Sequence, residues 1–158
     1  MKNFISVERV FIEKTFMRLY EKSENEVSAK RENSWSKKEI IGHLIDSASN
    51  NHQRFVRAQF KDDLVFPGYD QDQWVAAQNY QSADWHSLIQ LWKEFNLLII
   101  HVVENISEDI LKKERVNHNL YETAWKEIPA GKPATLEYFI KDYFDHLRHH
   151  IDKIFVQE

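Results

Sequence analysis

The 158-residue chain contains no cysteine and only three glycines and three prolines. Without cysteine it can form no disulfide bond or thiolate metal site, and any thiol used in a reaction would have to come from a second substrate. Ten Phe, six Tyr and five Trp stand against these few helix-breaking residues, a composition that favours a helical, densely packed fold. The length fits a single domain spanning residues 1–158.

The chain also lacks a strong net charge and a long apolar run. A formal net charge of −4 gives no electrostatic reason to bind nucleic acid or an anionic membrane surface. No run of about 18 apolar residues is present, so we expect no transmembrane span. Glu8 and Glu13 interrupt the apolar residues near the N-terminus, which argues against a signal peptide. We therefore expect a cytoplasmic protein.

Apolar residues recur at helical spacing in four segments. The pattern predicts helices from about Ser6 to Glu21, from Ser36 to near Phe60, from near Ser82 to about Asn105, and from near Thr135 almost to the end. Ser36 followed by Glu39 forms a capping box, which marks a helix start. Long, weakly patterned connections follow the second and third helices. The sequence thus predicts an all-α fold, a four-helix bundle with two long crossover connections.

Three details of these segments can be checked against a structure. In the first helix we expect Ser6 to be the N-cap and the apolar stripe to comprise Val7, Val10, Phe11, Met17 and Tyr20. In the last helix the stripe comprises Leu136, Ile140, Tyr143, Leu147, Ile151 and Ile154. The connection after the second helix is expected to hold a helical turn at Gln73–Ala77, and its length favours a functional role.

Three histidines are candidate metal ligands. His146 and His150 lie four residues apart, so their imidazoles share one helix face and can converge on one ion. Leu147 stands where the zincin motif requires a glutamate, which argues against metalloprotease chemistry of that type. A catalytic site usually needs a third protein ligand. The candidate is His43, which follows Gly42 beside the apolar stripe of the second helix. A buried histidine held by a hydrogen bond is the open alternative for His43.

The other histidines have simpler interpretations. His149 shares a helix row with Asp142, Asp145 and Asp152, which favours a solvated residue. Surface positions are expected for His52, His86, His101 and His118.

Three stretches together resemble the DinB/YfiT-like superfamily of bacterial four-helix-bundle proteins: "WSKKEIIGHLIDSASNNHQRF", "FPGYDQDQWV" and "DHLRHHIDKI". The resemblance covers nearly the whole chain in order. It implies a divalent-metal site, commonly nickel or zinc, on His43, His146 and His150. The chain departs from many relatives after the His pair, where they carry Arg-Gly-Gln and this chain has Ile151, Asp152 and Lys153.

The resemblance also implies a function and an assembly. Relatives include thiol-dependent S-transferases and proteins described as metal-dependent hydrolases, and many are dimers. We therefore expect a small-molecule substrate, a low-molecular-weight thiol as candidate cosubstrate, and a homodimer. Two alternatives stay open: a non-catalytic metal- or ligand-binding bundle acting in a stress response, and a bundle whose histidines only fill space. The sequence identifies no catalytic residue.

Further residues are candidates for the surroundings of this site. Asp46 could orient a ligand histidine by accepting its second ring proton, or be an ordinary exposed carboxylate. Tyr69 and Trp74 could cover a pocket, and Tyr143 and Trp35 could line it, although core packing is the commoner explanation of such aromatic residues. For Arg54 we expect a surface ion pair.

Overall fold

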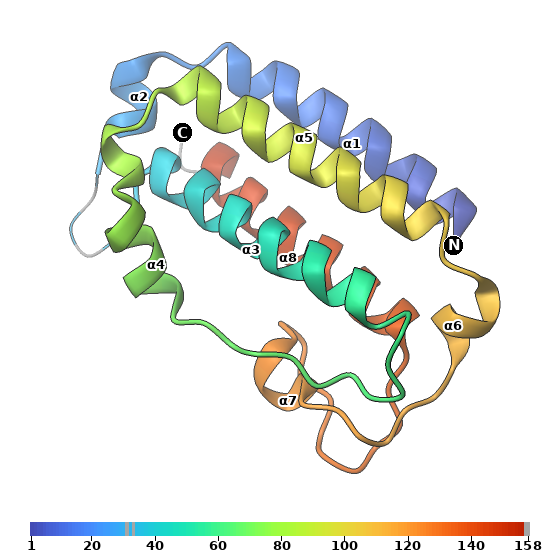
Figure 1. Cartoon of the computed structure of the whole chain (residues 1–158). Coiled ribbons are helices and arrows are strands. Elements are labelled where there is room, and N and C mark those ends of the chain that lie inside the picture. The colour runs from blue at the N-terminus through green and yellow to red at the C-terminus, as the bar shows by residue number, and fades with distance from the viewer. Residues whose placement is uncertain (31, 33, 157–158) are drawn as a thin grey trace.

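A computed structural model describes residues 1–30, 32 and 34–156 (Figure 1). Four long helices form a bundle: α1 (Lys2–Tyr20), α3 (Lys37–Arg57), α5 (Trp85–Glu104) and α8 (Leu136–Val156). Within the described residues there is no β-strand, only the isolated bridges Leu64–His118 and Arg115–Ala134. The predicted all-α four-helix bundle is confirmed. No helix in the described part of the chain is long and apolar enough to cross a bilayer.

The order of the helices in space requires long connections. Figure 1 shows α3 and α5 running in the same direction, with α1 beside α5 and α8 beside α3. The chain must therefore return along the bundle between α3 and α5, through α4 (Gln71–Gln78) and the short 3₁₀ helix η1 (Tyr80–Ser82). A second long connection, with α6 (Glu108–Lys112) and α7 (Leu120–Thr123), leads to α8. Both predicted crossovers are present.

Local capping sets where several helices begin. Ser36 caps α3 as predicted, because its side chain accepts from the Glu39 amide and the Glu39 carboxylate accepts from the Ser36 amide at 2.8 Å. The same device caps the short helix α2 (Glu24–Ser28), which lies within the polar stretch between α1 and α3. Asp70 caps α4 by accepting from the Gln73 amide at 2.9 Å. This cap makes α4 longer than the single turn expected at Gln73–Ala77.

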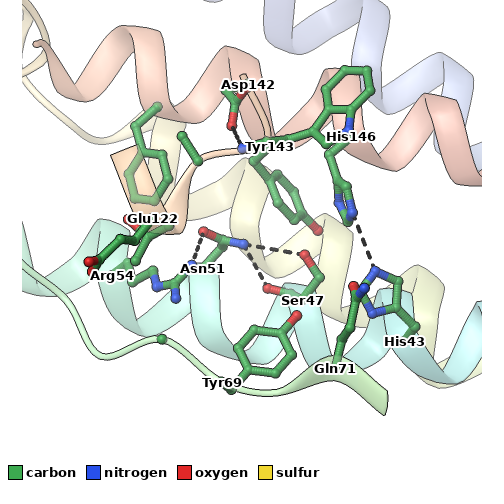
Figure 2. Close-up of a pocket in the computed structure, with 15 residues that line it drawn as sticks. His43, Ser47, Asn51, Arg54, Tyr69, Gln71, Glu122, Asp142, Tyr143 and His146 are labelled. Atoms are coloured by element: carbon green, nitrogen blue, oxygen red, sulfur yellow. Dashed lines mark hydrogen bonds between the residues drawn. The ribbon is translucent and has the colours of Figure 1, made fainter. Parts of the chain in front are cut away.

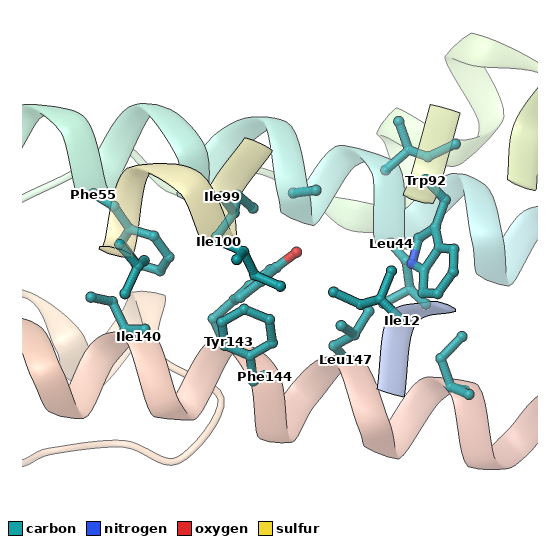
Figure 3. Close-up of a cluster of buried hydrophobic side chains, with 14 of the residues drawn as sticks. Ile12, Leu44, Phe55, Trp92, Ile99, Ile100, Ile140, Tyr143, Phe144 and Leu147 are labelled. Atoms are coloured by element: carbon teal, nitrogen blue, oxygen red, sulfur yellow. The ribbon is translucent and has the colours of Figure 1, made fainter. Parts of the chain in front are cut away.

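The core lies between the four long helices (Figure 3). Trp92 of α5 and Phe144 of α8 are among its largest fully buried side chains. The predicted stripe of α8 is confirmed, because all six of its residues are buried.

The prediction for α1 is wrong at both its start and its buried face. The helix begins at Lys2, so Ser6 lies inside it and caps nothing. Its buried residues are Ile5, Glu8, Ile12, Thr15 and Leu19, whereas Val7, Val10, Met17 and Tyr20 are exposed. The physical reason is that α1 carries apolar residues on more than one face. A carboxylate also belongs to the buried face, because Glu8 accepts a hydrogen bond from Arg148 of α8 at 2.8 Å.

Candidate metal centre

The structure brings the three predicted histidines together. His43 projects from the middle of α3, and His146 and His150 project one turn apart from α8. One ring nitrogen from each lies within 4.8 Å of the others, and the His43 and His146 Nε2 atoms are 3.3 Å apart. Figure 2 shows the rings of His43 and His146 facing each other between the two helices. Residues 103 positions apart in the sequence thus share one cluster.

Burial keeps these imidazoles neutral. Desolvation is the largest cause in each case, and it lowers the pKa of His43 to about 4 and that of His146 to about 3. It also lowers the pKa of His150, with further lowering from the neighbouring imidazoles and Lys153. A metal ligand must be an unprotonated imidazole, so the cluster is in the form that binds a metal at neutral pH.

The arrangement fits a divalent transition metal. Two nitrogen ligands at about 2.0–2.1 Å from a tetrahedral ion lie about 3.3 Å apart, which matches the 3.3 Å between His43 and His146 Nε2. Among the described residues, the Nδ1 atoms of His43 and His150 are buried without a hydrogen-bond partner. A purely structural histidine would be held by a hydrogen bond to the surrounding protein. Among the described residues, the His43 ring contacts only another histidine of the cluster in this way.

Gly42 allows a close contact immediately beside His43. A Cβ atom at this position would lie 2.1 Å from Tyr80 Cδ2, so the Tyr80 ring packs directly on the α3 backbone. The Tyr80 hydroxyl donates to Asp46 Oδ1 at 2.7 Å, and Gln78 Nε2 donates to the same oxygen at 2.6 Å. The segment after α4 is thereby fixed against the helix that carries His43.

A pocket of about 240 Å³ opens onto His43 and His146 (Figure 2). It lies between α3 and α8 and is closed by the two crossover connections. Its lining residues are His43, Ser47, Asn51, Arg54, Gly68, Tyr69, Gln71, Glu122, Thr123, Ala124, Trp125, Phe139, Asp142, Tyr143 and His146. A broader hollow of about 730 Å³ lies on the side of His150 and includes Trp35 and Lys153. The histidine cluster therefore has an opening on each side.

Comparisons with known proteins agree with this geometry. No family model matches the chain. Among solved structures, YfiT from Bacillus subtilis superposes with a TM-score of 0.77 over 97% of this chain and 82% of that chain, at 19% sequence identity. The chain therefore shares the four-helix-bundle fold of YfiT. YfiT is described as a probable metal-dependent hydrolase with an unusual four-helix bundle topology.

One curated relative has a similar description. A protein of Halalkalibacterium halodurans named "Putative metal-dependent hydrolase" is 26% identical over 124 residues. The match covers 78% of this chain and 66% of the relative, so the chain spans just under two thirds of that protein's length.

The bundle places the other predicted residues in different positions relative to the pocket. Tyr69 and Tyr143 line the pocket, and the Tyr143 hydroxyl donates to the core residue Asn96 at 2.7 Å. Trp74 is 38% exposed and packs against Tyr69 with ring centroids 4.8 Å apart, so it supports the wall from outside the lining. Trp35 packs against the His43 ring at 5.0 Å and lines the broader hollow.

Asp46 is neither the exposed carboxylate nor the histidine partner considered from the sequence. Only 3% of it is exposed, and its Oδ1 atom is bound by Tyr80 and Gln78. Burial, the largest cause, raises its pKa against these two hydrogen bonds. Its Oδ2 atom is buried without a partner among the described residues, and no hydrogen bond to His43 is formed.

Sequence reasoning misplaced three further polar residues. His118 is buried rather than on the surface, because its Nδ1 atom accepts from the Leu120 amide and its Nε2 atom lies 2.7 Å from the Lys132 carbonyl oxygen. Asp142 is buried as well, and it accepts from the amides of Trp125 and Lys126 at 2.8 and 2.7 Å. These two bonds hold the segment after α7, residues 124–126, at the pocket, and this segment is called the Trp125 loop. Arg54 is 6% exposed, and no carboxylate in the described part of the chain pairs with it.

The remaining histidine predictions agree with the structure. His149, His86 and His101 are exposed, and His52 is half-buried. His149 lies outside the cluster and packs its ring against Trp125 at 5.1 Å.

Proposed function

We propose that the chain is a divalent-metal-dependent enzyme that hydrolyses a small molecule, with His43, His146 and His150 as the metal ligands. The observation that carries the proposal is the convergence of three neutral imidazoles from two helices beside a pocket. The descriptions of YfiT and of the Halalkalibacterium relative as metal-dependent hydrolases support it. A divalent metal on three imidazoles supplies a Lewis acid that can polarise a substrate oxygen and lower the pKa of a bound water.

The chain's own residues hold the ligands in place. Tyr80, packed on Gly42 and bound to Asp46, fixes the turn of α3 that carries His43. In this proposal Asp46 is a positioning residue that acts through Tyr80 and not through a hydrogen bond to an imidazole. Outer residues of this kind fix the orientation of metal ligands, and their loss typically weakens metal binding about 10–100-fold.

Other residues shape the space in which a substrate would react. Asp142 anchors the Trp125 loop, and Trp125 lies 6.2 Å from the His146 ring, measured between centroids. Tyr69 forms the wall contributed by the first crossover. These aromatic walls lower the local dielectric, which strengthens interactions between charged groups inside the pocket.

Several finer assignments form part of the proposal. Three imidazoles suit nickel and zinc equally well, so we propose one of these two metals. Transfer to a low-molecular-weight thiol is the second candidate reaction, and its thiol would have to come from a cosubstrate because the chain has no cysteine. We also propose a homodimer that acts in the cytoplasm. A non-catalytic metal-binding bundle is the alternative that a measured turnover would eliminate.

Elemental analysis tests the site separately from the reaction. We expect about one nickel or zinc ion per chain in the purified protein, and loss of that ion in each of His43→Ala, His146→Ala and His150→Ala. His149→Ala is the matched control, because its exposed ring lies beside the cluster but outside it. Unchanged metal content in the three variants would show that the site is wrong.

A product analysis then tests the reaction. Esters and amides are incubated with the metal-loaded protein, with and without added thiol. Hydrolysis without thiol supports the hydrolase, whereas product that forms only as a thiol adduct supports S-transfer. Metal retention with no turnover of either kind would favour the non-catalytic alternative.

A further inference from the structure

Arg54 is a buried cation, and none of the described residues provides it with an anionic partner. It lines the pocket from α3 and is 6% exposed. Its guanidinium donates to the Pro67 carbonyl at 2.8 Å and, at the longer distance of 3.4 Å, to Asn51 Oδ1. Both acceptors are neutral, and no carboxylate within the described residues forms an ion pair with it. Arginine is rarely buried unless it is paired, so this residue requires an explanation.

Among the described residues, the other buried arginine illustrates a purely structural role. Arg115 is 4% exposed and donates to three backbone carbonyls, those of Ile110, Lys113 and Ala58. It ties loops together and does not line the pocket. Arg54 makes fewer bonds and belongs to the pocket wall. A guanidinium has five N–H donors in a planar fork that matches a carboxylate, so donors remain for a ligand.

We infer that Arg54 binds a carboxylate of the substrate, at the end of the pocket opposite the histidines. Figure 2 shows Arg54 and Glu122 at one end of the pocket and His43 with His146 at the other. The inference deepens the proposed function and rests on it in one respect, namely that the reacting end of the molecule lies at the histidine cluster.

The spacing along α3 sets the shape of such a substrate. Arg54 follows His43 by eleven residues on the same helix, a separation of about 16 Å along the helix axis. Both side chains line one pocket of about 240 Å³. That volume lies below the range of about 300–1,000 Å³ usual for small-molecule sites. The structure therefore fits a slender molecule with a terminal carboxylate and a reacting group separated by a spacer.

Glu122 favours a carboxylate over a more highly charged group. This residue of α7 lines the same end of the pocket and forms no ion pair with Arg54 among the described residues. Its negative charge opposes any anion that approaches Arg54, and it opposes a dianionic phosphate more strongly than a singly charged carboxylate.

A ligand pair tests the inference on the metal-loaded protein. The probes are linear hydroxamic acids, whose hydroxamate binds a metal, with a terminal carboxylate or its uncharged methyl ester and a series of spacer lengths. At the best spacer length, we expect calorimetry to show the acid binding at least about tenfold more tightly than its ester, because charge-assisted hydrogen bonds to arginine form only with the acid. Arg54→Gln should abolish that preference and leave the ester affinity unchanged.

Two variants serve as controls for the arginine. Arg57→Gln removes an exposed charge one turn further along α3 and should leave the preference intact. Glu122→Gln should strengthen binding of the acid and not of the ester, because it removes the opposing charge while Arg54 stays in place. This second variant also keeps the test decisive if Arg54→Gln fails to fold.

A metal-independent measurement separates failure of this inference from failure of the proposed function. Hexanoate and hexanol are compared by ligand-observed NMR on the metal-free protein. Hexanoate should bind the wild type and lose binding in Arg54→Gln, with hexanol unaffected. Equal behaviour of hexanoate in both proteins, or equal affinity of acid and ester at every spacer length, overturns the inference. Failure of the hydroxamates alone, with hexanoate binding intact, argues against the metal site and supports the Arg54 subsite.

Discussion

At the residue scale, the glycine that precedes His43 is as important to the arrangement of the site as the histidines. Gly42 lets the Tyr80 ring lie on the backbone of α3, and the Tyr80 hydroxyl then reaches Asp46 one turn further along. Any larger residue at position 42 must displace this ring. The three residues therefore act as one unit next to His43.

Replacing Gly42 by alanine should destabilise the protein. Alanine improves helix propensity by about 1 kcal/mol, but overpacking against a ring 2.1 Å away costs about 1–3 kcal/mol. Loss of the Tyr80–Asp46 hydrogen bond adds about 1 kcal/mol. Urea denaturation should show a net loss of about 1–3 kcal/mol in the free energy of unfolding.

Gly68→Ala is the matched control, because a Cβ there has nothing within 4 Å. It should change stability by no more than about 0.5 kcal/mol. If Gly42→Ala were as stable as the wild type, the ring would be free to move and the unit described above would not exist.

At the element scale, an ion pair between the buried Glu8 and the partly exposed Arg148 joins α1 and α8. Glu8 is 3% exposed, and burial, the largest cause, raises its pKa despite the hydrogen bond and charge of Arg148. The guanidinium also lies over the Phe11 ring, 3.9 Å from its centroid. Removing Arg148 would leave a carboxylate buried in the interface between the two helices.

Arg148→Met should therefore destabilise the protein in a pH-dependent way. The pKa of Glu8 would rise further, so between pH 4.5 and that raised value the folded protein would hold a proton that the unfolded chain has released. Stability then falls as pH increases through this interval. We expect near-wild-type stability at about pH 4 and a loss of about 2–3 kcal/mol in the free energy of unfolding at about pH 7. This loss is smaller than that for a fully buried ion pair, because Arg148 is partly exposed to solvent.

Arg9→Met provides the comparison between surface and interior. Arg9 pairs with Glu104 of α5 at 2.9 Å, but both side chains are about 40% exposed or more. Its loss should cost at most about 1 kcal/mol at either pH. Urea denaturation measures the free energy of unfolding of both variants across this pH range. If the two variants lost stability equally at every pH, Glu8 would not act as a buried carboxylate.

These elements also show which features a sequence can predict. The Ser36–Glu39 cap and the His146–His150 pair are local, so spacing alone predicted them. The buried face of α1 depends on Arg148, which is 140 positions from Glu8, and no local pattern records that contact. Asp142 looked like a solvated carboxylate because its partners are amides of a loop that the sequence left unassigned.

At the scale of the whole molecule, the histidine cluster joins elements that lie far apart in the chain. His43 belongs to α3, and its two partners belong to the last helix. A metal that binds these residues only in the folded state must stabilise that state by mass action. Stability should therefore depend on metal through the triad alone.

Thermal unfolding measures this dependence. At a free metal concentration of about 100 times the dissociation constant, nickel or zinc should stabilise the wild type by about 2.7 kcal/mol, or roughly 5–10 °C in Tm. His43→Ala should lose this shift, and His149→Ala should keep it. A shift of equal size in both variants would place the metal elsewhere on the protein.

The 103-position separation of His43 and His146 has a consequence for synthesis. A nascent chain emerging from the ribosome presents His43 long before His146 and His150, because α8 is made after α3 and the crossovers. A product that terminates before α8 carries only His43 of the three histidines and cannot form the complete cluster. Under the proposed site, only chains that include α8 would acquire the ion, so the metal would distinguish them from shorter fragments.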